Sequence, residues 1–268
     1  MTAALTPQLR RAQVRPLTEL AAGRLAGALP VGPGLAAVLP DGLRRGATIE
    51  VGGGTGAVSL VLALLGGASE QGSWSAAVGF PLLSADAAAD HGIDLSRFAL
   101  VPRPGPDWTT VVGALLDSID VVAVRLPRPP ARLSDGDARR LAARARQRGS
   151  ILVPLAPAAA RDGGWPTADV RLQAELSADG AGWTGIGPGH GRLQQRRLTV
   201  QARGRGAAAR PRRGAVWLPD RVGGAGPVES PVAALPTRSV PTPLSVPLSV
   251  SRPAGRPAPH PNDPSEAR

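Results

Sequence analysis

A glycine-rich turn offers the clearest opportunity for chemistry in this sequence. Gly52-Gly53-Gly54-Thr55-Gly56 follows a short apolar strand and precedes an apolar helix, an arrangement in which backbone amides can cradle phosphate oxygens. A working phosphate loop continues with a lysine and a hydroxyl residue, whereas this chain has Ala57 and Val58 there. Ser59 comes one position late, about 100° further around the helix. We favour a structural role for the turn and keep nucleotide binding without hydrolysis as the alternative.

The composition removes several other kinds of chemistry. The chain of 268 residues contains no cysteine, and all 31 of its basic residues are arginine, so it contains no lysine. These absences exclude thiolate metal sites, cysteine nucleophiles and Schiff-base lysines. The three histidines, His91, His190 and His260, are far apart, and no catalytic triad or pair of carboxylates is visible. We expect neither a metal nor a cofactor.

The charge of the chain points to an anionic partner. The formal net charge is +11, which favours binding to nucleic acid or to an acidic protein surface. The first residues lack the apolar region of a signal peptide. The longest apolar run, residues 57–65, is about half of the length that a bilayer requires. We therefore expect a cytoplasmic protein, with nucleoid association as an option, and no membrane partner.

Two arginine clusters are candidate surfaces for DNA or a protein partner. Within residues 139–148 five arginines occur without an acid, and the pairs Arg140/Arg144 and Arg144/Arg148 are spaced to share one helix face. A second cluster without acids spans residues 192–213 and includes a predicted loop between strands. The alternative for both is a solvated surface in an arginine-biased chain. The candidate residues are Arg139, Arg140, Arg144 and Arg148 in the first cluster and Arg192, Arg196, Arg197, Arg203, Arg205, Arg210, Arg212 and Arg213 in the second.

The elements that must position these residues alternate along the chain. Apolar segments predict strands at 48–51, 74–80, 97–101, 121–124 and 151–155. Helical patterns lie at 17–29, 57–65, 85–91, 108–118 and 134–147, with the second ended by Gly66-Gly67 and the last opened by a Ser134-x-x-Asp137 capping box. This alternation predicts an α/β fold with a mostly parallel sheet flanked by helices. Further strands at 170–176, 196–202 and 215–218 predict an antiparallel extension.

The composition changes near residue 223. From there to residue 268 prolines recur every few residues and no periodic apolar face survives. We expect residues 223–268 to form a disordered tail, either an unbound linker or an extended docking peptide, and residues 1–222 to form the folded domain.

Several segments resemble the core of the RecA/RadA recombinases. They are Ile49-Glu50-Val51-Gly52, His91-Gly92-Ile93-Asp94-Leu95 and the strand at 118–124. The lysine-free turn, Trp74, Val78-Gly79-Phe80-Pro81 and Gly189-His190-Gly191-Arg192 further resemble actinobacterial ImuA-type proteins, which are RecA-like accessory factors of damage-induced mutagenesis. The resemblance covers roughly residues 20–220 and implies a RecA-like fold.

The same resemblance implies that the ATPase positions have lost their catalytic groups. Ala57 stands at the phosphate-binding lysine, Phe80 or Pro81 at the base, and Arg125 at the metal-binding aspartate. We therefore expect a non-enzymatic adaptor in SOS mutagenesis that recruits or organises an error-prone polymerase and its Y-family-like accessory subunit. DNA contact and self-association are further options. The alternatives are a nucleotide-dependent, recombinase-like DNA-binding ATPase and a RecA-like SOS cell-division inhibitor.

Overall fold

A mostly parallel sheet forms the centre of the computed structural model. The structure describes residues 27–52, 54–126, 133–156, 164–187, 190–205, 209–220 and 224–228, apart from the side chains of residues 178–187, 190–192 and 194. Within that part the sheet has nine strands in the order β11-β10-β9-β8-β3-β7-β6-β4-β5. The parallel strands are β3 (Ile49–Gly52), β4 (Ser75–Val78), β5 (Phe98–Val101), β6 (Val121–Arg125), β7 (Ile151–Leu155) and β8 (Val170–Gly187). The predicted α/β architecture is confirmed.

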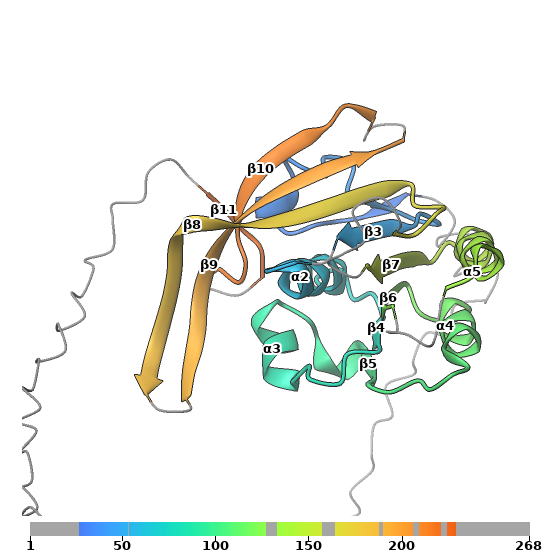
Figure 1. The fold of residues 1–268 in the computed structure, drawn as a ribbon, viewed down its shortest axis with the longest axis horizontal. Coiled ribbons are helices and arrows are strands. Elements are labelled where there is room, and N and C mark those ends of the chain that lie inside the picture. The colour runs from blue at the N-terminus through green and yellow to red at the C-terminus, as the bar shows by residue number, and fades with distance from the viewer. Residues whose placement is uncertain are drawn as a thin grey trace, which may run out of the picture. The chain divides into compact units, whose positions relative to one another are not determined.

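The sheet continues beyond β8 with antiparallel strands, as expected. They are β9 (His190–Gly204), β10 (Arg212–Trp217) and β11 (Gly226–Pro227). Register shifts interrupt the β8–β9 pairing after Leu176, and Figure 1 shows this hairpin bending away from the helix-covered sheet. Strand β11 pairs with β10 and lies past the expected domain boundary at residue 222. Residues 229–268 lie outside the described residues.

Helices cover both faces of the parallel strands (Figure 1). Helix α2 (Ala57–Ser69), with α3 (Ala85–Asp90) beside it, packs on one face around Leu60 and Leu64. Helices α4 (Trp108–Leu116) and α5 (Asp135–Arg148) pack on the other face around Trp108 and Leu141. Strands β4, β6 and β7 are buried on both sides, which explains their continuous apolar sequences.

Helix α5 begins and ends one residue later than predicted, with Ser134 and Gly149 as the caps that flank it. The Ser134 hydroxyl accepts a hydrogen bond from the Asp137 amide at 3.0 Å, as in a capping box. Gly149 follows the helix with φ of 67°, a left-handed conformation that glycine adopts readily.

The prediction that Gly66 and Gly67 end α2 is wrong, because the helix continues to Ser69. A Cβ on Gly66 would lie 1.9 Å from the carbonyl oxygen of His91, and one on Gly67 would lie 2.8 Å from the Cα of Val31. The two glycines therefore allow neighbouring backbone to approach the helix.

The predicted helix at 17–29 is wrong at its C-terminal end, where residues 28–29 form a strand. Strand β1 (Ala28–Leu29) pairs with β2 (Leu43–Arg44), and residues 1–26 lie outside the described residues. A short 3₁₀ helix, η1 (Pro33–Leu35), lies between these strands. Among the described residues, no helix has both the length and the apolarity to cross a bilayer.

Candidate functional site

The glycine-rich turn joins β3 to α2 and is packed against β9. Gly56 caps α2 with φ of +94°, and a Cβ there would lie 2.7 Å from Cδ2 of Leu198. Ala57, at the lysine position, is 2% exposed and belongs to the apolar core. Gly54 and Thr55 are exposed, and Gly53 lies outside the described residues. Leu198 therefore covers the helix end of the turn, and the absence of a side chain at Gly56 permits this contact.

A half-buried arginine of β9 contacts the first turn of α2. Arg196 of β9 donates a hydrogen bond from Nη2 to the Ser59 hydroxyl at 2.6 Å. Its Nε is buried and has no hydrogen-bond partner among the described residues. Burial lowers the pKa of the Arg196 guanidinium. The structure thus joins a residue of the phosphate-loop region to one of the second arginine cluster.

A cavity of about 590 Å³ opens beside this contact. Phe80, one of the two residues expected at the position of the catalytic base, is 2% exposed, and it lines the cavity together with Arg125 at the end of β6. Two carboxylates of α3, Asp86 and Asp90, also line it. No group of three potential metal ligands occurs among the described residues.

His91 lines the same cavity from the end of α3. Its Nδ1 lies 2.7 Å from the carbonyl oxygen of Ala87, and its buried Nε2 has no hydrogen-bond partner among the described residues. Burial lowers the pKa of His91 and outweighs the hydrogen bond to Ala87 and the charge of Asp90, which raise it. In the neutral imidazole whose Nδ1 donates to Ala87, Nε2 is an acceptor.

The four candidate arginines of α5 form ion pairs with three carboxylates, which offset most of their charge. The hydrogen bond from Arg144 to Asp117, at 2.8 Å, holds the pKa of Asp117 below its ordinary value. Asp117 follows α4, so the sequence around α5 gave no sign of it. The ion pairs of the four candidates are Arg139 with Asp135, Arg140 with Asp137, and Arg144 and Arg148 with Asp117.

The second cluster is divided among several surfaces. Successive strand residues point to opposite faces, so Arg196 lies on the side of α2 while Arg197 lies on the other side. Arg213 pairs with Glu175 at 3.5 Å. The side chain of Arg192 lies outside the described part. Three of the remaining members are exposed, namely Arg203, Arg205 and Arg210. The fourth, Arg212, is half-buried.

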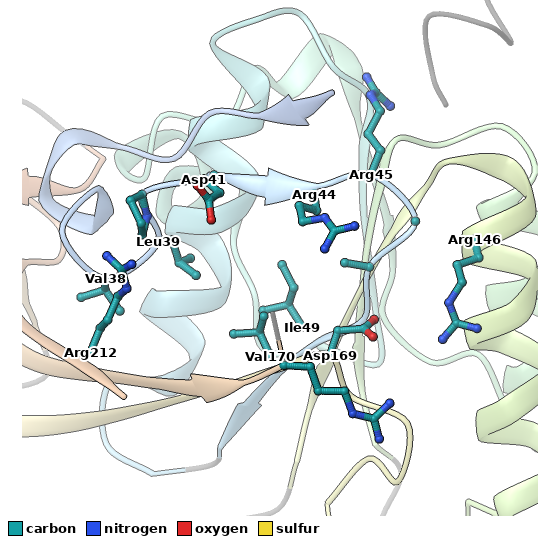
Figure 2. A pocket seen from close by; sticks show the side chains of 15 residues that line it. Val38, Leu39, Asp41, Arg44, Arg45, Ile49, Arg146, Asp169, Val170 and Arg212 are labelled. Atoms are coloured by element: carbon teal, nitrogen blue, oxygen red, sulfur yellow. The ribbon is translucent and has the colours of Figure 1, made fainter. Parts of the chain in front are cut away.

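A pocket of about 160 Å³ lies where β3 and β8 begin, at the edge of the sheet opposite the glycine-rich turn. Figure 2 shows Arg44 and Arg146 around it, with Arg212 on the side of Val38. Arg205 also lines it. The pocket thus brings together arginines of both predicted clusters. Sequence spacing did not place Arg146 on the predicted helix face, and no motif singled out Arg44.

Comparisons with known proteins agree with this fold. Residues 37–167 match the family model described as the MT3502 N-terminal domain. The uncharacterized protein Rv3395c of Mycobacterium tuberculosis is 34% identical over 201 residues, which cover 73% of this chain and 90% of that relative. The crystal structure of the RadB recombinase has a TM-score of 0.54 and 16% identity, and the similarity covers 74% of this chain and 97% of that chain. The fold is RecA-like, and the chain belongs to the family that includes Rv3395c.

Proposed function

We propose that this protein is a non-enzymatic RecA-like adaptor in DNA-damage-induced mutagenesis. One observation carries the proposal: the positions at which the resemblance places the charged catalytic groups of a RecA-type ATPase hold Ala57, Phe80 or Pro81, and Arg125. Ala57 and Phe80 are buried, and Arg125 is exposed at the end of β6.

These replacements oppose phosphoryl transfer for separate physical reasons. The reaction needs a cation at the γ-phosphate, a group that orients the attacking water, and a carboxylate that holds Mg²⁺. Phe80 cannot accept a proton, and the guanidinium of Arg125 repels Mg²⁺ where a carboxylate would attract it. Removing one electrostatic group of this kind typically costs about 3–4 kcal/mol of transition-state stabilisation. The joint loss of three such groups supports a role other than ATP hydrolysis.

The adaptor role and its partners follow from the resemblance to ImuA-type proteins. The proposed partners are an error-prone polymerase and its Y-family-like accessory subunit, with DNA as a further ligand. The net charge of +11 supports an anionic surface on at least one partner. The proposed site of action is the cytoplasm, in association with the nucleoid.

A genetic test addresses the pathway. Deletion of the gene should lower the frequency of mutations induced by ultraviolet light, and the intact gene should restore it. A variant with Arg125→Ala should restore it equally well, because the proposal assigns no catalytic role to Arg125. Induced mutagenesis that is unchanged by the deletion would contradict the proposal. Filamentation on overexpression without any effect on mutagenesis would instead indicate a cell-division inhibitor.

Co-purification tests the adaptor role itself. The tagged full chain should retain the polymerase and the accessory subunit from damaged cells, before and after nuclease treatment. Loss of both proteins on nuclease treatment would show that DNA bridges them and would argue against direct recruitment.

A further inference from the structure

The arginine-rimmed pocket has an apolar interior of limited size. Its lining includes Val38, Leu39 and Ile49, which are 2%, 6% and 1% exposed. Its volume of about 160 Å³ is close to that of an engineered apolar cavity of ~150 Å³ that binds benzene. Pockets for whole small-molecule ligands are larger, at about 300–1,000 Å³. The interior therefore suits one aliphatic or aromatic side chain.

Hydrogen bonds hold one wall of this pocket in place. The carboxylate of Asp169 accepts a hydrogen bond from the Thr48 amide at 2.9 Å, and the Asp169 amide donates to the Thr48 carbonyl at 2.8 Å. The Arg205 amide donates to the Asp169 carbonyl at 2.9 Å. These contacts tie the start of β8 and the end of β9 to the segment that enters β3.

The opposite wall is fixed by a turn that packs on α5. Arg45 donates to a carboxylate oxygen of Asp120 at 3.0 Å, and Figure 2 shows its side chain pointing away from the pocket. Gly46, with φ of +78°, brings this turn so close that an added Cβ would lie 3.2 Å from the Cα of Arg146. A pocket with fixed walls loses little conformational entropy on binding, which favours affinity.

The rim of the pocket carries more positive than negative charge. Arg44, Arg146, Arg205 and Arg212 form no ion pair with any described residue. The acidic residues of the lining are Asp41 and Asp169. Guanidinium groups bind carboxylates through paired, charge-assisted hydrogen bonds. A ligand with carboxylates around one apolar group would therefore match both the rim and the interior.

The two ends of this chain are not acidic segments of that kind. Residues 1–26 contain four arginines and one acid, and residues 229–268 contain four arginines and three acids. A nucleic acid would satisfy the rim, but no aromatic side chain among the described residues of the lining offers a surface on which a base could stack. We infer that this pocket docks an acidic segment of a partner protein that inserts one apolar side chain.

Peptide probes test this inference on the full chain. The first probe is a fluorescein-labelled peptide with one central phenylalanine between runs of glutamate and aspartate. The second replaces the phenylalanine by serine, and the third replaces the acids by glutamine and asparagine. In fluorescence anisotropy titrations at low salt, the first probe should bind about tenfold or more tightly than either control.

Matched variants locate the binding. Arg146→Glu with Arg212→Glu should weaken the first probe about tenfold or more, whereas Arg139→Glu with Arg140→Glu, which adds the same charge elsewhere, should change it by less than about twofold. Ala47→Leu fills the lining and should remove the advantage of phenylalanine over serine. Circular dichroism and thermal melting confirm that each variant is folded.

Three results would overturn the inference. They are equal binding of the phenylalanine and serine probes, equal losses in the two double variants, and a single-stranded oligonucleotide that binds at Arg146 and Arg212 more tightly than the first probe. The identity of the partner rests on the proposed function, but the site does not. If the peptide test fails but deletion of the gene lowers induced mutagenesis, the adaptor role is supported and the pocket inference is refuted. If the first probe binds as expected but deletion leaves induced mutagenesis unchanged, the pocket inference is supported and the adaptor role is refuted.

Discussion

Two buried helical glycines should respond to alanine in opposite directions. Gly66 lies in α2 and Gly113 in α4. Alanine normally stabilises a helix by about 1 kcal/mol relative to glycine, because glycine loses more backbone entropy on folding. Helix propensity alone therefore predicts the same gain at both positions.

The surroundings of the two glycines decide the sign. At Gly113 the closest atom to a new Cβ is Nη1 of Arg144 at 3.5 Å, which is ordinary contact, so we expect a gain of ~0.5–1 kcal/mol. At Gly66 the carbonyl oxygen of His91 lies 1.9 Å from the Cβ position, and the backbone after α3 must shift. Overpacking costs about 1–3 kcal/mol. A contact this short belongs at the upper end of that range, so the net loss should be about 2 kcal/mol.

Thermal unfolding followed by circular dichroism measures both effects. For a domain of this size 1 kcal/mol corresponds to about 2–4 °C. The melting temperature should rise by ~2–3 °C in Gly113→Ala and fall by ~4–8 °C in Gly66→Ala. A melting temperature that rises in both variants would refute the packing of Gly66 against His91 and would show that helix propensity decides the stability at both positions.

Three further perturbations follow from the contacts around the site. Leu198→Ala should lower the free energy of unfolding in urea by about 2–5 kcal/mol, because it removes the fully buried side chain that covers Gly56; a loss below ~1 kcal/mol would contradict this packing. Ser134→Ala should cost about 1 kcal/mol through the lost cap to Asp137, whereas Ser134→Asp should cost less. Burial holds the pKa of His91 below its ordinary value, so the unfolded state takes up the proton first, and stability should fall as the pH drops below about 6.5 towards the folded-state pKa. This fall should be smaller in His91→Gln, and identical pH profiles would contradict the burial of His91.

Much of the sheet and of α5 could be predicted because their signals are local. Apolar runs such as residues 121–124 identify strands that are buried on both sides. Ser134 and Gly149 identify the ends of α5 through hydrogen bonds and backbone angles within a few residues. The role of Gly66 in α2 was not predictable in this way, because it depends on His91, which lies in another element.

The candidate site could be predicted only in part for the same reason. Arg144 and Arg148 both pair with Asp117, which follows a different helix and offsets one of their two charges. The rim of the small pocket needs Arg146 beside Arg212, two residues that only the tertiary fold brings together. Strand alternation did carry one unused signal: Arg196 has the same parity as Leu198 and Val200, which predicts that it faces the core.

The central claim is that this RecA-like domain does not turn over ATP, and one titration tests it most directly. The full chain is mixed with labelled ATP and Mg²⁺, and both bound nucleotide and released phosphate are measured. Because the resemblance places Ala57, Phe80 or Pro81, and Arg125 at the three catalytic positions, we predict no binding at micromolar nucleotide and no phosphate release above buffer. Micromolar affinity together with turnover would contradict the adaptor proposal and would favour a recombinase-like ATPase.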